Sequence, residues 1–272
     1  MNLPVGVVLH DYKIPVKGVA KKILYHISDI HLNHSDNPAT ETKPLNYETW
    51  LAGWPGFAIH HKEPYELSQM KQPEDHLSCL LELANTGDSF ILTGDICDKV
   101  SHANLAILDE QLSKAKKPWL GVCGNHDMAA DLPDGYLYSK IKQPVQVLDL
   151  GDLILFGVDD SLRQVTAEQT TALRKVLELG KPVIIVMHIP IMTEENRDVL
   201  INCGDYFRLN HPEATEETLA FIDCIRQNEG KIAAVLTGHL HFLNESRIAP
   251  GIPQFVNSQS VLGNINRYEI GE

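Results

Sequence analysis

Positive charge is scarce in this sequence. Lysine and arginine number 23 against 36 aspartates and glutamates, and the formal net charge is −13 with neutral histidines. A protein that binds nucleic-acid backbones needs clustered Lys and Arg to release the counterions of the phosphates. We therefore expect no nucleic-acid partner, although a local cationic pocket or bound metal ions could still hold a phosphate.

Cysteine pairs, a secretion signal and long apolar runs are also lacking. The five cysteines include no C-x-x-C pair, and the first residues do not show the basic and then apolar pattern of a signal peptide. No apolar run approaches the ~20 residues that cross a bilayer. We expect a cytoplasmic protein with no membrane partner.

Short, mostly apolar runs alternate with amphipathic patterns along the chain. The runs predict strands buried on both faces at 23–29, 89–95, 119–125, 153–160, 182–188 and 233–239. The amphipathic patterns predict helices at 74–85, 102–116, 166–179 and 214–228. This alternation predicts an α/β layered fold, and with 43% hydrophobic residues we expect one domain over residues 1–272. Segments 1–20 and 245–270 are expected to form edge strands or hairpins.

Two long connections break the alternation, at 32–73 and 189–213. Connections of this length are uncommon unless they serve a function or are disordered, and the aromatic content of the first disfavours disorder. Its Trp50 and Trp54 have i, i+4 spacing, which is typical of an inserted helix packed on the domain, or else of a lid that stacks on a base or sugar. Arg197 and Arg208 in the second connection are expected in surface ion pairs; the alternative is a grip on a substrate phosphate.

Polar residues stand at the ends of most predicted strands. They are Asp29, His31, Asp95, Asp98, Asn125, His126, Asp127, His188, His239 and His241. Because ligands bind at the carboxyl ends of strands in such sheets, we expect these side chains to converge on one rim. Asp29 with His31, and His239 with His241, have i, i+2 spacing, which places both side chains on one face of an extended backbone. Each pair could therefore chelate a metal ion.

Structural roles compete with this interpretation. Asp29, Asp95 and Asn125 could each cap a following helix, since Asp and Asn are preferred at that position. His188 alone, after an apolar strand, is typical of a hydrogen-bonded core histidine. Asp159 and Asp160 are expected to satisfy backbone donors in a turn, and Cys97 and Cys123 to serve in packing. Capping explains too little when four histidines also stand at strand ends.

The donor types favour particular metals. Carboxylate and amide oxygens with imidazole nitrogens, and no thiolate, suit divalent ions such as Mn, Fe, Zn or Co. Seven candidate ligands exceed the needs of one ion. Two ions that share a bridging carboxylate would use them all, and such pairs lie ~3.5–4 Å apart and contact both the attacking and the leaving oxygen of a phosphoryl transfer.

The ordered motifs resemble those of the calcineurin-like metallophosphoesterases over about residues 23–241. The motifs are Asp29-Ile30-His31, Gly94-Asp95-Ile96-Cys97-Asp98, Gly124-Asn125-His126-Asp127, His188 and Gly238-His239-Leu240-His241. The resemblance implies a four-layer α/β/β/α sandwich, the metallo-dependent phosphatase-like fold, with an insertion at about 32–73 and two metals at the carboxyl ends of the strands.

The same resemblance implies roles for the site residues. One metal would be held by Asp29, His31, Asp95 and His241, and a second by Asp95, Asn125, His188 and His239. A metal-bridging hydroxide would attack phosphorus, His126 would protonate the leaving oxygen, and Asp98 would orient His126. The resemblance implies no definite role for Asp127.

Departures from the family pattern narrow the substrate class. The motif at 94–99 lacks the Arg-Gly of the serine/threonine phosphoprotein phosphatases, and Asp98 stands where purple acid phosphatases have a tyrosine. The chain looks most like the class III cyclic-nucleotide phosphodiesterase branch. We expect hydrolysis of a small phosphate mono- or diester, such as a nucleotide or cyclic nucleotide, with two Mn, Fe or Zn ions as cofactors. The alternatives are a nuclease and a non-catalytic metal-binding scaffold; the sequence predicts no oligomeric state.

Overall fold

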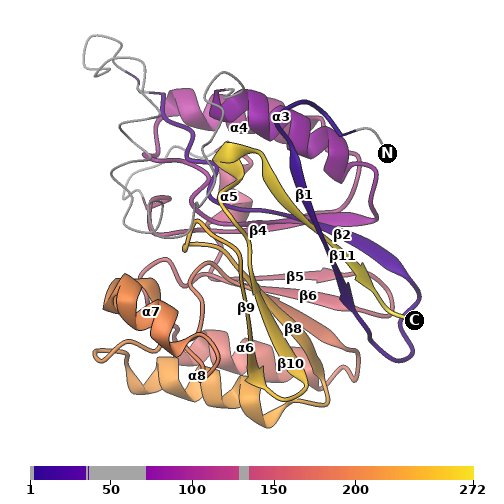
Figure 1. Cartoon of the computed structure of the whole chain (residues 1–272), viewed down its shortest axis with the longest axis vertical. Coiled ribbons are helices and arrows are strands. Elements are labelled where there is room, and N and C mark those ends of the chain that lie inside the picture. The colour runs from indigo at the N-terminus through magenta and orange to yellow at the C-terminus, as the bar shows by residue number, and fades with distance from the viewer. Residues whose placement is uncertain (1–2, 35, 37–71, 129–134) are drawn as a thin grey trace.

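The computed structural model describes residues 3–34, 36, 72–128 and 135–272 of the chain. Within these residues, two β-sheets lie face to face between two groups of helices (Figure 1). Helices α3 (Pro73–Ala84) and α4 (His102–Ser113) cover the first sheet. Helices α6 (Ala167–Leu177) and α8 (Glu216–Gln227) cover the second. The predicted four-layer sandwich is confirmed.

The first sheet has the strand order β1-β11-β2-β3-β4. Its strands are β1 (Val8–Ile14), β11 (Asn264–Ile270), β2 (Lys22–Ile27), β3 (Ser89–Thr93) and β4 (Trp119–Val122). Strands β2, β3 and β4 are parallel, and β11 runs parallel to β1 and antiparallel to β2. The loops that follow β2, β3 and β4 therefore leave from one edge of this sheet.

The second sheet has the strand order β5-β6-β7-β8-β10-β9. Its strands are β5 (Val145–Asp149), β6 (Ile154–Val158), β7 (Val183–Val186), β8 (Ile232–Thr237), β10 (Ile252–Val256) and β9 (Asn244–Ala249). The four central strands are parallel, and β5 and β9 are antiparallel edge strands. Short helices α5 (Tyr138–Ile141) and α7 (Arg197–Cys203) complete the pattern, together with 3₁₀ turns at Asp205–Phe207 and Ser260–Leu262.

Alternate residues of the central strands enter different parts of the core. In β3, Phe90 and Leu92 pack with the residues of α3 and α4, while Ile91 packs between the two sheets. In β6, Phe156 packs with α6 and α8, and Leu155 lies between the sheets. Because both faces of these strands are covered, their sequences are apolar throughout rather than alternating.

The expectation of edge strands or hairpins at the termini is confirmed for β1, β9 and β10 and is wrong for β11. Strands β1 and β9 are edge strands, and β9 pairs with β10 as an antiparallel hairpin. Strand β11, by contrast, lies between β1 and β2. The polar residues of β11 conceal its burial: Asn266 is fully buried, and its side-chain amide donates to the Tyr268 hydroxyl at 3.0 Å. The Asn266 amide nitrogen thus has a partner, while its Oδ1 has none among the described residues, and β11 is internal despite a partly polar sequence.

All six strands and four helices expected from periodicity are present, with boundaries that differ by a few residues. Most of the 32–73 insertion lies outside the described residues, and Trp50 and Trp54 lie there too. A single domain with this insertion stays a prediction.

Candidate metal centre

The loops that carry the candidate ligands have unusual backbone angles. Asp29, His31, Asp95, His239 and His241 have φ values of 54°, 51°, 48°, 71° and 60°. Few non-glycine residues adopt this left-handed region, and such strain gathers at functional sites. The expectation that the i, i+2 pairs share a face of extended backbone is therefore wrong. These residues follow the strands in tight turns, and His239 and His241 belong to different groups of side chains.

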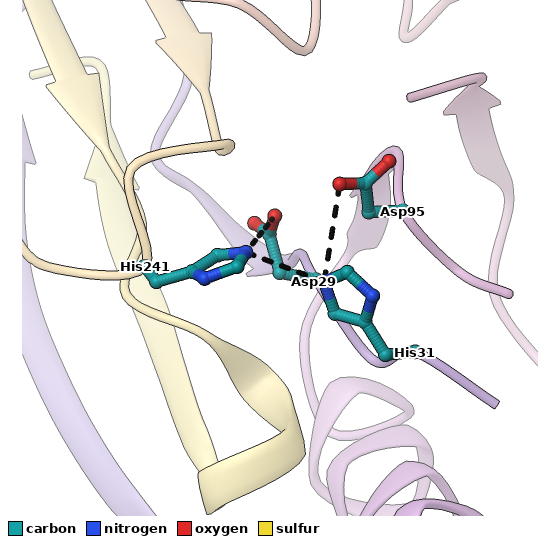
Figure 2. Close-up of side chains that lie close together, drawn as sticks. All are labelled: Asp29, His31, Asp95 and His241. Atoms are coloured by element: carbon teal, nitrogen blue, oxygen red, sulfur yellow. Dashed lines mark hydrogen bonds and ion pairs between the residues drawn. The ribbon is translucent and has the colours of Figure 1, made fainter. Parts of the chain in front are cut away.

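The first group consists of Asp29, His31, Asp95 and His241, whose ligand atoms all lie within 4.8 Å of one another. Figure 2 shows these four side chains directed toward a common point from separate segments of the chain. His241 Nε2 lies 3.2 Å from Asp29 Oδ1 and 3.2 Å from His31 Nε2, and His31 Nε2 lies 3.8 Å from Asp95 Oδ2. Carboxylate oxygens and imidazole nitrogens at these separations can share one cation.

The second group consists of Asp95, His188 and His239, so Asp95 belongs to both. His188 Nε2 lies 3.3 Å from Asp95 Oδ2 and 3.1 Å from His239 Nδ1. The side-chain oxygen of Asn125 is 3.1 Å from the same His188 nitrogen. A carboxylate oxygen, an amide oxygen and an imidazole nitrogen thus surround His188 Nε2. His188 is buried, as the core-histidine interpretation expects, but its Nε2 faces a group of potential metal ligands.

Hydrogen bonds from outside the groups fix which imidazole nitrogens face inward. His188 Nδ1 lies 2.6 Å from the Thr93 carbonyl oxygen, and His239 Nε2 lies 3.2 Å from the Tyr206 carbonyl oxygen. A carbonyl accepts only a protonated nitrogen, so in the neutral form of each histidine the opposite ring nitrogen carries the lone pair and faces the centre. Partners of this kind orient metal-binding histidines in proteins. The donor set and its support fit a metal pair.

Burial and neighbouring charges shift the pKa values of the carboxylate and histidine side chains of this centre. Burial raises the pKa of Asp95, but the neighbouring His188 outweighs it and holds the pKa well below the usual range. For His188, burial lowers the pKa, and Asp95 more than offsets that and raises it to about 10. Burial and the charge of His188 lower the pKa of His239 to about 3. The shared carboxylate is therefore ionised inside the protein, where a positive partner stabilises it.

His126 lies beside the centre and is joined to Asp98. Its Nδ1 is 3.3 Å from Asp98 Oδ1 and 3.1 Å from the Asp98 carbonyl oxygen, and its backbone N–H donates to Asp95 Oδ1 at 2.8 Å. The hydrogen bond that His126 donates to Asp98 is the main reason that the pKa of His126 rises to about 9. The ring is 41% exposed, so Nε2 has access to a bound molecule. His31, Asp98 and His126 also form a third group of potential ligands.

Two buried carboxylates hold the loops of the centre. Asp127 accepts the backbone N–H groups of Ile96, Cys97 and Gly124 at 3.1, 2.8 and 2.9 Å. Asp160 accepts those of His188 and Ile189 at 2.9 and 2.8 Å, which confirms its expected role as a backbone acceptor. Burial raises the pKa of Asp127 to about 6 and that of Asp160 to about 7. Asp127, unassigned from sequence, is thus a structural link between two loops.

The capping alternative is wrong for the described helices. The residues whose side chains cap them are Ser101, Thr166 and Thr215, and neither Asp29, Asp95 nor Asn125 stands at a cap position. Cys97 and Cys123 are free and buried, as expected for packing residues.

Both arginines of the second connection form the expected ion pairs, although Arg208 is buried rather than at the surface. Arg197 pairs with Glu194, and Arg208 pairs with Asp205. Both partners lie only three residues away in the chain.

Sequence reasoning missed a polar segment behind the site, residues 257–260. The Ser258 hydroxyl donates to the carbonyl oxygen of His241 at 3.2 Å, and Ser260 Oγ accepts the backbone N–H of Ser28 at 3.0 Å. Both serines are buried, and their hydrogen bonds hold the backbone at His241 and Ser28, on either side of the first group. A polar run directly after a buried strand was the available signal, but it matched no motif.

Comparison with known proteins agrees with this geometry. Residues 23–243 match the family model described as calcineurin-like phosphoesterase, so the chain belongs to that family and is a phosphoric ester hydrolase. No curated protein sequence matches it. Within the described residues, no helix has the length and apolar character to span a membrane.

Solved structures are similar to this chain at low sequence identity. A dimetal phosphatase from Danio rerio is 10% identical, with 88% of each chain covered and a TM-score of 0.55. TT1561 from Thermus thermophilus is 12% identical, with 89% of this chain and 91% of that chain covered and a TM-score of 0.49. Phosphopantetheinyl hydrolase from Mycobacterium tuberculosis is 14% identical, with 88% and 90% covered and a TM-score of 0.44.

Proposed function

We propose that this phosphoesterase is a binuclear metal enzyme that hydrolyses a small phosphate mono- or diester, such as a nucleotide or cyclic nucleotide. The observation that carries the proposal is that Asp95 belongs to two groups of metal-binding side chains. A carboxylate between two sites permits ions ~3.5–4 Å apart, the separation of metal pairs that contact both oxygens of a phosphoryl transfer.

Each ion has four candidate ligands in this proposal. Asp29, His31, Asp95 and His241 would hold one; Asp95, Asn125, His188 and His239 would hold the other. Their oxygen and nitrogen donors suit Mn, Fe or Zn. The pKa of the nearby Cys97 thiol is raised well above its usual value by burial, which disfavours a thiolate ligand.

The chain's own groups position the reaction. Bound here, two cations would lower the pKa of a water molecule and stabilise negative charge on phosphoryl oxygens. His126, held at Nδ1 by Asp98, presents Nε2 from the partly exposed side of the centre. We assign it the transfer of a proton to the leaving oxygen, with Asp98 as the residue that orients it. Asp127 and Asp160 keep the ligand loops in place.

The motif at 124–127 and the segment Met187-His188-Ile189-Pro190 support membership of the class III cyclic-nucleotide phosphodiesterase branch. The net charge of −13 weighs against a nuclease. We also propose that residues 1–272 form a single domain.

The test uses metal-free protein with p-nitrophenyl phosphate and its bis ester. We expect no turnover until Mn²⁺ is added. The Asp95→Asn variant should neither retain two metals nor hydrolyse either ester. Asp152→Asn is the matched control, because the Asp152 carboxylate pairs with Lys22 and accepts the backbone N–H of Ala20, each at 2.8 Å, and belongs to neither group of candidate ligands. Full activity of the metal-free protein, or of Asp95→Asn, would contradict the proposal.

A further inference from the structure

Two aromatic residues of the second long connection line the candidate metal centre. The rings of Tyr206 and Phe207 lie 5.5 and 5.1 Å from the ring of His239, measured between centroids. The carbonyl of Tyr206 accepts the hydrogen bond that orients His239. The Tyr206 side chain is 45% exposed, so it stands at the rim of the centre rather than in the core.

Arg163 reaches this rim from the turn after β6. Its φ is 60°, again in the left-handed region, and its backbone N–H donates to the Asp160 carbonyl at 2.7 Å. Asp160 in turn holds the backbone of His188 through its carboxylate. The turn that presents Arg163 is therefore tied to a candidate ligand, and its strained conformation persists because these bonds fix it.

The guanidinium of Arg163 contacts neighbouring groups but forms no ion pair with a carboxylate of the described residues. It lies 4.9 Å from the ring centroid of Tyr206, and Nη2 donates to the Asp205 carbonyl at 3.1 Å. Its Nε is buried and has no hydrogen-bond partner among the described residues. Five other arginines, by contrast, form an ion pair with an aspartate or glutamate: Arg197, Arg208, Arg226, Arg247 and Arg267. Within the described part of the chain Arg163 has no such pair.

We propose that Arg163 binds a second anionic group of the substrate, in addition to the phosphate that is hydrolysed, and that Tyr206 holds its guanidinium in position. A planar guanidinium stacked on an aromatic ring keeps its N–H groups in a fixed fork that suits phosphate or carboxylate. The substrate class is then a phosphate ester with a further phosphate or carboxylate on the part that does not react. This inference rests on the proposed function, because it concerns the substrate of the same centre.

The test compares two ligands that differ by one anionic group. Binding of adenosine 5′-monophosphate and of adenosine 5′-(α,β-methylene)diphosphate to the Mn²⁺-loaded protein is measured by calorimetry. We expect Arg163→Gln to reduce the preference for the diphosphate analogue by about tenfold or more, the typical weight of a hydrogen bond to a charged group. Tyr206→Leu should reduce the same preference, and Tyr206→Phe should keep it, since the contact is with the ring.

Arg174→Gln is the matched control. It removes the same charge from an exposed position on α6 and should leave the preference unchanged. An unchanged preference in Arg163→Gln, or an equal loss for both ligands, would overturn the inference. The Tyr206 variants give an independent answer if Arg163→Gln does not fold. Turnover of the bis ester by the unmodified protein is measured separately, so failure of the proposed function is distinguished from failure of this assignment.

Discussion

The carboxylate of Asp127 accepts the backbone N–H of Cys97 at 2.8 Å, although the two residues are 30 positions apart on different loops. The same carboxylate accepts Gly124 N–H. It therefore joins the loop that carries Asp95 and Asp98 to the loop that carries Asn125 and His126.

Asp127→Asn should reduce the free energy of unfolding by ~1–3 kcal/mol, because one of two acceptor oxygens becomes an N–H₂ group that faces backbone donors. Urea denaturation of the metal-free protein measures the change. Asp88→Asn is the control, since Asp88 accepts the Ile23 N–H at an exposed position and should change stability by less than ~0.5 kcal/mol. Equal losses in the two variants would show that Asp127 is not an important link.

His126→Ala should retain both metals and lose ~10²–10⁴ in turnover on esters with poor leaving groups, the typical contribution of a general acid. The loss should shrink for p-nitrophenyl esters, whose leaving oxygen needs no proton. Rates across a series of leaving groups, with metal analysis of each preparation, check this. If the mutant cleaves alkyl esters as fast as the unmodified protein, His126 is not the acid.

Gly124→Ala should abolish the assembled centre. A Cβ at Gly124 would collide with the carboxylate and the backbone nitrogen of Asp95, and neither can move without displacing the shared ligand. Metal content and turnover should both fall. Gly230→Ala, where a Cβ would meet open space, should leave both unchanged.

His26 should make stability depend on pH. It is fully buried, its Nε2 lies 2.7 Å from Thr93 Oγ1, and burial lowers its pKa to about 3 from 6.5. Below pH 6.5 the unfolded chain binds a proton that the folded protein does not, so this histidine's contribution to stability falls as the pH drops toward 3.

The measurement compares the unmodified protein with His26→Gln, which cannot titrate, by urea denaturation with chelator at pH 7 and 5. Between these values the unmodified protein should lose about 2 kcal/mol more than the variant. Equal losses would mean that His26 is protonated in the fold.

The sequence predicts those parts of this molecule that depend on local pattern. Because both faces of β3 and β6 are covered, their sequences are apolar and these strands could be recognised. The polar residues that follow the strands marked the centre. The pairing of β11 could not be predicted, because buried polar residues such as Asn266 hide the apolar pattern expected of an internal strand. The backbone of the ligand loops also escaped prediction, since left-handed turns replaced the extended backbone that the i, i+2 spacing suggested, although the family resemblance assigned His239 and His241 to different metals. Arg163 and Tyr206 belong to no motif, and only their contact across the fold distinguishes them.

The first group joins His31 to His241, 210 residues later in the chain. At ~5–20 residues added per second, a ribosome makes the first of these ligands at least ~10 seconds before the last. During that interval the first group lacks His241, one of its four candidate ligands. An ion held by all four would therefore report that synthesis has passed β8, and a chain arrested earlier would differ from a finished one by weaker metal retention.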